Sequence, residues 1–227
     1  MFGIISDICN VKINFMKLFL ATLVFCSIAV CGHSQSSKSQ TILNSLSASM
    51  KKMSTFYVEF NANIKNTATG VNESEKGMGW VKGNKFFASY GEITLLSNGY
   101  KTWTVINEEK SVYESETSDD EESMNPKKLM TIWESGFKNK YMKLASFNGE
   151  NVHVINLYPT DPENTDYHTI ILYISEKSKA LKKAIMKTND GTTMSYHLTK
   201  FESNKPIADS KFTFNKSKYP GFAVIRD

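Results

Sequence analysis

The stretch between Gly77 and Tyr113 constrains the fold of this chain more than any other, because short aromatic and β-branched runs alternate there with Gly and Asn. The runs are Trp80-Val81, Phe86-Phe87, Ile93–Leu96 and Trp103–Ile106, and the residues between them include Gly83-Asn84, Gly91 and Asn98-Gly99. Apolar runs of strand length that are bounded by such turn residues are typical of antiparallel strands joined by tight turns. The stretch therefore predicts a β meander.

Two further periodicities precede the meander. Apolar residues recur at spacings of three and four between Thr41 and Met53, which predicts an amphipathic helix. The period then changes to two from Phe56 to Ile64, so one face of this strand is apolar and the other is polar. One-sided burial of this kind suits an antiparallel sheet that is covered on one side.

The rest of the chain adds a loop, a helix and more strands. An acidic loop is predicted at Glu114–Glu122, followed by a short apolar helix from about Pro126 to Gly136. Strands are predicted at Val152–Tyr158, Tyr167–Ile174, Leu181–Lys187, Met194–Phe201 and Phe212–Phe214. The fold class that follows is α+β: a single large curled antiparallel sheet, an incomplete β-barrel, with short helices covering its concave apolar face.

The N-terminus has the parts of a secretory signal peptide. Met16-Lys17 precedes an apolar run from Leu18 to Val30, and small residues follow at Gly32 and Ser34. We expect Met16 to be the true start and cleavage to follow Ser34. Residues 1–34 would then be an upstream extension plus a cleaved signal peptide, and residues 35–227 the mature domain in the periplasm.

Two alternatives for this segment stay open. The apolar run could be retained as an anchor helix, although it is shorter than the roughly 20 residues that a membrane span needs. Cys31 could instead be acylated as a lipoprotein N-terminus, although Val30 is bulky where that motif has a small residue. Cleavage after Ser34 would remove all three cysteines, Cys9, Cys26 and Cys31, so the mature chain would form no disulfide.

Composition and motifs argue against nucleic-acid binding and against catalysis. The formal net charge is only +4, and the lysines are interleaved with acidic residues rather than clustered. The sequence after Ser34 has no cysteine and no nucleophile elbow, phosphate loop or metalloprotease motif. Its histidines, His153, His168 and His197, lie on three different predicted strands, and we expect no metal site from them. We expect a binding protein without a cofactor.

The order of several short motifs resembles the family of the periplasmic lipoprotein carrier LolA. They are Gly-x-Gly-Trp-Val-Lys at Gly77–Lys82, Ser97-Asn98-Gly99, Lys101-Thr102-Trp103, the Phe-rich strand Phe56–Ile64, the Asn-Pro at Asn125 and the closing Lys211–Phe214. The resemblance covers nearly all of the chain after the signal segment. It departs from the family at Gly83, where the family often has an arginine linked to holding a lid.

The resemblance implies a soluble carrier that takes acylated lipoproteins from an ATP-driven transporter of the inner membrane and passes them to an acceptor at the outer membrane. We expect a monomer. Alternation along the strands suggests which side chains line the acyl-chain cavity: Phe60, Met78, Trp80, Phe87, Leu96, Trp103, Ile170 and Leu172. The covering helix would form a lid through Leu129, Met130 and Trp133.

Two rival functions remain for such a fold. It could be an envelope lipid-binding sensor or a structural module, in which case it would have a fixed protein partner rather than a cargo. It could also be a lipid hydrolase, for which the sequence offers neither a nucleophile elbow nor a paired base.

Overall fold

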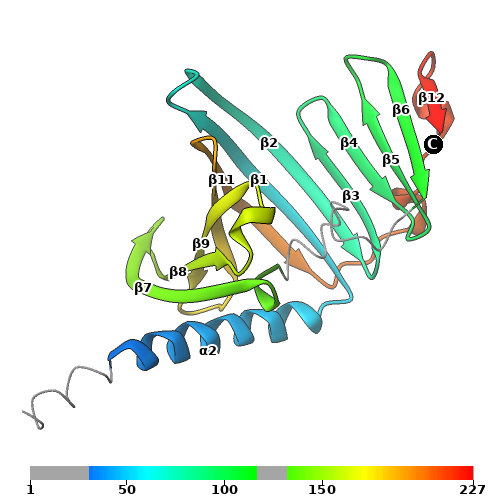
Figure 1. Ribbon diagram of the computed structural model, residues 1–227. Helices are drawn as coiled ribbons and strands as arrows, with labels where there is room; N and C mark the ends of the chain where they lie inside the picture. Colours follow the sequence, from blue (N-terminus) through cyan, green and yellow to red (C-terminus); the bar gives the residue numbers. More distant parts are fainter. Residues whose placement is uncertain (1–30, 117–131, 227) are drawn as a thin grey trace, which may run out of the picture.

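The computed structural model describes residues 31–116 and 132–226, which form one twelve-stranded sheet, one α-helix and four short 3₁₀ helices (Figure 1). The spatial order of the strands is β12-β6-β5-β4-β3-β2-β1-β11-β10-β9-β8-β7. Every pairing is antiparallel except that of β12 with β6. The sheet is curled and open, as predicted.

The first six strands comprise the predicted strand Phe56–Ile64, which is β1, and the predicted meander, which is β2 to β6. They are β1 (Thr55–Asn66), β2 (Val71–Lys82), β3 (Lys85–Tyr90), β4 (Ile93–Ser97), β5 (Lys101–Ile106) and β6 (Ser111–Glu116). Each pairs with the next. Four of the turns carry a glycine with positive φ, at Gly70, Gly83, Gly91 and Gly99, a conformation that glycine adopts without the steric cost of a Cβ. The Gly and Asn punctuation of the sequence therefore marks real turns.

The second half of the chain supplies the other strands. They are β7 (Phe137–Phe147), β8 (Glu150–Pro159), β9 (Tyr167–Ser175), β10 (Leu181–Thr188), β11 (Thr192–Ser203) and β12 (Ala223–Arg226). The 3₁₀ helices are η1 (Ile132–Glu134), η2 (Pro162–Asn164), η3 (Asp209–Phe212) and η4 (Lys216–Lys218). β1 pairs with β11 as well as with β2, so β1 joins the two halves of the sheet.

Helix α2 (Cys31–Lys51) packs on one face of this sheet, which we call the inner face (Figure 1). Its apolar side chains are buried in one cluster with inward-facing side chains of the strands. From the helix these are Ile42, Leu43, Leu46 and Met50, and from the sheet Phe56, Val81, Phe86, Ile155, Leu157, Ile170, Leu172 and Ile174. Phe56 and Val58 face this cluster, so the predicted alternation of the first strand is confirmed there.

The opposite face, which we call the outer face, has a second core over β4, β5 and β6. Leu96, Trp103, Val105 and Val112 are buried there. The C-terminal segment, residues 205–226, packs on them through Phe214, Tyr219, Phe222 and Val224. Its last strand, β12, then adds to β6 in parallel.

The predicted strand at Phe212–Phe214 is wrong. Phe212 ends η3, and its side chain is fully buried. The two phenylalanines, two residues apart, match the spacing of a strand but pack separately. The ring of Phe214 stacks on Trp103, with ring centroids 6.3 Å apart. The acidic loop predicted from Glu114 also starts too early, because Glu114 lies in β6 and accepts a hydrogen bond from Trp103 Nε1 at 3.1 Å.

The curl of the sheet is strong at its β7 end. Phe147 of β7 and His197 of β11 are separated by three strands, yet their ring centroids are 5.0 Å apart. Phe147 also lies 5.9 Å from the ring of Tyr173 on β9. The turn between β7 and β8 is therefore brought against the middle of β11 on the outer face.

Residues 1–30 of the expected signal segment, most of the predicted short helix, and Leu129 and Met130 lie outside the described residues. Within the described ranges, the protein has no helix that is both long enough and apolar enough to cross a membrane.

Candidate functional site

A row of apolar side chains crosses the inner face beyond the region that α2 covers. Strand register aligns Leu198 of β11, Phe60 of β1, Gly77 of β2, Tyr90 of β3, Ile93 of β4 and Ile106 of β5. We call this set the inner row. Gly77 is buried, the other side chains of the row are partly buried, and Ile93 is 40% exposed. The row therefore offers apolar surface that the described residues leave partly open.

Aromatic contacts organise the middle of the inner row. The ring of Phe60 stacks on Tyr90, with centroids 6.3 Å apart and an interplanar angle of 17°. It also meets Tyr196 edge-on, with centroids 6.1 Å apart. Gly77 makes this packing possible, because its missing side chain leaves room for the Phe60 ring. Such aromatic pairs stabilise by roughly 0.5–1.5 kcal/mol beyond the area that they bury.

The tyrosines of this cluster stay neutral at physiological pH. Burial raises the pKa of Tyr196 above its ordinary value, with a smaller contribution from Tyr90. The pKa of Tyr90 is also raised, first by burial and then by the carboxylates of Glu75 and Glu73. The cluster thus provides uncharged aromatic surface, with the carboxylates of Glu75 and Glu73 near Tyr90.

The neighbouring row on the inner face continues the apolar surface. Val58, Gly79, Ala88, Leu95, Thr104 and Tyr113 are aligned by the same strand pairings. Val58 and Leu95 pack against the α2 core, whereas Tyr113 at the far end is 39% exposed. Contiguous partly exposed apolar surface of this kind marks binding sites more often than isolated exposed residues do.

One border of this surface is formed by α2 and η1. Trp133 of η1 is buried and donates a hydrogen bond from Nε1 to Ser47 Oγ at 2.8 Å. Next to it, Lys51 Nζ lies 2.9 Å from Glu134 Oε1. Hydrogen bonds from Lys51 and then Ser47 lower the pKa of Glu134. These contacts attach η1 to the C-terminal half of α2.

The structure does not bring the eight predicted acyl-chain residues together on one face. Phe60, Ile170 and Leu172 lie on the inner face, the last two within the α2 core. The other five occupy the outer face: Met78, Trp80, Phe87, Leu96 and Trp103. Of the three predicted lid residues, the structure describes only Trp133, as part of the inner core.

The outer placement has a physical reason in β2. The inner positions of its second half are Gly77, Gly79 and Val81, so its bulky residues Met78 and Trp80 point outward. Alternation along a strand separates two faces, of which we expect only one to be apolar from the sequence, and the structure has apolar side chains on both. The C-terminal segment covers much of the second apolar face, and Lys211 Nζ lies 3.6 Å from the centroid of the Phe87 ring.

Sequence reasoning missed Tyr90, Ile93 and Tyr196. A signal for Tyr196 was present, because Met194, Tyr196 and Leu198 alternate with Ser195, His197 and Thr199. For Tyr90 and Ile93 the signal is weaker, since the strands around Gly91 are only six and five residues long. Their place on the inner face follows from cross-strand register, which a single sequence does not show.

The three histidines of the strands do not converge. His153 is buried next to Tyr141, and burial is the main cause that lowers its pKa, whereas His197 lies on the outer face. Among the residues that the structure describes, no group of three His, Cys, Asp or Glu side chains is placed to hold a metal ion.

Comparison with protein families gives one match across the sheet. The model for the outer membrane lipoprotein carrier protein LolA matches residues 51–215, which is most of the chain. This chain belongs to the LolA family. Comparison with curated proteins gave no match.

Several solved structures are similar to this chain at low sequence identity. An uncharacterized conserved protein from Thermus thermophilus has 10% identity and a TM-score of 0.52, with 84% of this chain and 99% of that chain covered. LprF from Mycobacterium bovis has 12% identity and a TM-score of 0.46, with coverages of 77% and 97%. The LolA superfamily protein NE2245 from Nitrosomonas europaea has 12% identity and a TM-score of 0.40, with coverages of 79% and 98%.

The departure from the LolA-family pattern at Gly83 falls in the turn between β2 and β3, where φ is 60°. The nearby Lys85 pairs with Asp209 Oδ2 at 2.7 Å, and Lys82 pairs with Asp209 Oδ1 at 2.8 Å. Both lysines therefore hold the C-terminal segment on the outer face.

Proposed function

We propose that this LolA-family protein is a periplasmic carrier that binds the acyl chains of lipoproteins on the inner face of its sheet. The observation that carries the proposal is the inner row, a line of partly exposed apolar side chains from Leu198 to Ile106. The row crosses six strands, and with strands about 4.8 Å apart it is about 24 Å long. That length suits an extended acyl chain.

Energetics support a large apolar site for such cargo. Each acyl methylene removed from water contributes about 0.8 kcal/mol, so a lipoprotein anchor with several chains needs extensive apolar cover to cross an aqueous compartment. The inner row and the neighbouring row of Ala88, Leu95 and Tyr113 together provide such a surface. Neutral aromatic rings at its centre suit chains that carry no charge.

The proposal includes the route of the cargo. The protein would receive acylated lipoproteins from an ATP-driven transporter of the inner membrane and release them to an acceptor at the outer membrane. Family membership and the signal-like segment before Gln35 support this route. Binding is stoichiometric in this proposal and the lipid leaves unchanged.

The experiment uses capture of a synthetic triacylated peptide by the mature protein. Phe60→Glu and Ile93→Glu each place a carboxylate on the inner row, where an acyl chain would have to desolvate it. Asn72→Glu is the matched control, because it adds the same charge to an exposed position of β2 on the outer face. We expect both inner variants to capture at least about tenfold less peptide, in line with a lost burial of several methylenes.

Thermal unfolding of each variant separates loss of binding from loss of fold. Ile93 is already 40% exposed, so Ile93→Glu should stay folded even if Phe60→Glu does not. Capture by the folded inner variants at the level of Asn72→Glu would contradict the proposed site. Mass spectrometry of the bound peptide completes the test, because release of free fatty acid would indicate a hydrolase. Copurification of one fixed protein without lipid would indicate a sensor.

A further inference from the structure

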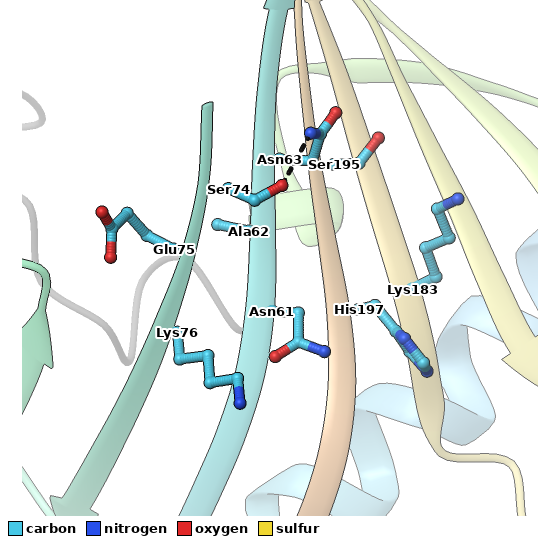
Figure 2. A pocket seen from close by; sticks show the side chains of 9 residues that line it. All are labelled: Asn61, Ala62, Asn63, Ser74, Glu75, Lys76, Lys183, Ser195 and His197. Atoms are coloured by element: carbon cyan, nitrogen blue, oxygen red, sulfur yellow. Dashed lines mark hydrogen bonds between the residues drawn. The ribbon is translucent and has the colours of Figure 1, made fainter. Parts of the chain in front are cut away.

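A polar pocket of about 450 Å³ lies on the outer face, on the same strands that carry Phe60 and Tyr196 inward (Figure 2). Residues of β1, β2, β10 and β11 line it: Asn61, Ala62, Asn63, Ser74, Glu75, Lys76, Lys183, Ser195 and His197. Because side chains alternate along a strand, the residues next to Phe60 and Tyr196 face this pocket instead of the inner row. The pocket is therefore separate from the proposed acyl site.

The charge of the pocket is positive. Lys76 and Lys183 each bring an ammonium group, and His197 brings an imidazole. The one acidic residue of the lining, Glu75, directs its carboxylate away from the other labelled side chains (Figure 2). Pairing of Glu75 with Ala62 places both residues on the inner side of the strands. The outward-facing lining thus combines two cations with no carboxylate.

Four of the neutral lining residues carry hydrogen-bonding side chains. Asn61 and Asn63 carry amide groups, and Ser74 and Ser195 carry hydroxyls. Asn63 Nδ2 donates to Ser74 Oγ at 3.0 Å and to Glu73 O at 3.1 Å, which uses both hydrogens of this amide but leaves the hydroxyl hydrogen of Ser74 to donate elsewhere. A lining of ammonium, amide and hydroxyl donors matches a ligand rich in acceptor oxygens.

Contacts from the β7–β8 turn fix two of these groups. Asn148 Nδ2 lies 3.1 Å from His197 Nε2, and the Phe147 ring meets the imidazole edge-on at 5.0 Å. Lys183 Nζ lies 5.7 Å from the centroids of both Phe147 and Tyr173. The curl of the sheet therefore orients the imidazole and one ammonium beside the pocket before any ligand arrives.

We propose that this pocket binds an anionic phosphate group. A phosphate presents several acceptor oxygens around one centre, and its negative charge offsets the repulsion between two ammonium groups. A volume of about 450 Å³ exceeds that of one phosphate, so the group esterified to it is accommodated as well. A metal cation would be repelled by the lysines, and an acyl chain would leave the polar lining unsatisfied. The phosphate belongs either to a soluble ester or to a phospholipid headgroup at a membrane surface.

Two binding arms distinguish these sources. In the first, calorimetry measures binding of inorganic phosphate and glycerol 3-phosphate to the mature protein. In the second, co-sedimentation measures binding to vesicles of phosphatidylglycerol with phosphatidylcholine, against vesicles of phosphatidylcholine alone. Binding in the first arm alone, saturating at one ligand per protein, assigns a soluble ester. Binding in the second arm alone, dependent on the anionic lipid, assigns a phospholipid headgroup.

The deciding variant is Lys76→Gln with Lys183→Gln. Its control is Lys138→Gln with Lys187→Gln, which removes the same net charge; Lys187 lies on the same strand and the same face as Lys183 but outside the pocket. We expect the affinity of the pocket variant to fall by at least about tenfold. The affinity of the control should stay within about twofold of that of the unmodified protein. Equal loss in both variants, or no binding of the unmodified protein in either arm, would overturn the proposal.

Discussion

The distal edge of the Phe60 ring lies directly over Gly77, so close that a Cβ added at Gly77 would stand 2.2 Å from Phe60 Cζ. The two residues are cross-strand partners on β1 and β2. Gly77 is therefore required by the position of a neighbouring ring and not by its own φ angle. Through this contact the backbone of β2 sets where the aromatic centre of the inner row lies.

Gly77→Ala should destabilise the protein by about 1–3 kcal/mol, because the Phe60 ring would have to leave its contacts with Tyr90 and Tyr196. Denaturant unfolding measures the loss. The control is Gly79→Ala, whose added Cβ would meet its nearest atom, Phe87 O, at 3.4 Å, and which should change stability by no more than about 1 kcal/mol. Combining Gly77→Ala with Phe60→Leu should cost less than the sum of the two changes; strict additivity would show that the ring is not the obstacle.

Ser47→Ala should destabilise the attachment of η1 to α2. It removes the acceptor of the buried Trp133 Nε1–H, and an unpaired buried donor costs about 1–3 kcal/mol. Ser45→Ala is the matched change on the same helix, where the exposed hydroxyl only donates to Thr41 O, and it should alter stability by less than about 0.5 kcal/mol. If thermal unfolding shows the same effect for both serines, the indole contact contributes nothing measurable.

Asp209 should give the protein an acid-labile contact on the outer face. Hydrogen bonds from Lys82 and then Lys85 lower the pKa of Asp209 from 3.8 to about 2. The folded state therefore keeps this carboxylate ionised at pH values where the unfolded chain binds a proton. Its contribution to stability is present above pH 3.8 and is lost as the pH falls toward about 2.

The measurement compares the unmodified protein with Asp209→Asn across that pH window. The difference between their free energies of unfolding should shrink as the pH falls, and added salt should shrink it at higher pH because the pair is exposed. A difference that stays constant from neutral pH to about pH 2 would show that the two ion pairs do not stabilise the C-terminal segment.

A chain that begins at Gln35 should fold as the longer chain does. The side-chain contacts described for α2 start at Lys38, whose Nζ lies 4.0 Å from the centroid of the Tyr141 ring, and continue with Gln40 Oε1, which accepts from Asn139 Nδ2 at 2.8 Å. Export of the chain expressed from Met16, followed by N-terminal sequencing, should yield Gln35 as the first residue. An acylated Cys31 found there would replace the soluble carrier with an anchored lipoprotein.

Local patterns predicted the fold well where each strand carries its own signal. The alternation from Phe56 to Ile64 and the glycine turns at Gly83, Gly91 and Gly99 are properties of short segments, and the structure confirms them. β7 was missed because Lys138, Lys140 and Lys143 interrupt its apolar residues and its strand pairs on one side only, with β8. An edge strand leaves a weaker pattern than a buried one.

The candidate site was harder to predict than the fold because it depends on which strands are neighbours. Period-two alternation separates two faces but does not say which one α2 covers. Trp103 illustrates this limit, since an aromatic residue on a strand is expected in a ligand cavity. Trp103 instead stacks on Phe214, 111 residues later in the chain, under the C-terminal segment. The partners of Phe60 likewise come from β3 and β11.

The parallel pairing of β12 with β6 imposes an order on assembly. Ala223–Arg226 adds to a strand that ends more than a hundred residues earlier, so the loop that this pairing closes is among the longest in the sheet. Closing a long loop costs more chain entropy than closing a hairpin, and local strands form first. Until the C-terminal segment has been synthesised and has packed, Leu96, Trp103 and Val112 remain without their cover. During that interval the nascent sheet exposes an apolar surface that the finished protein hides, and this is when a molecular chaperone would have most to bind.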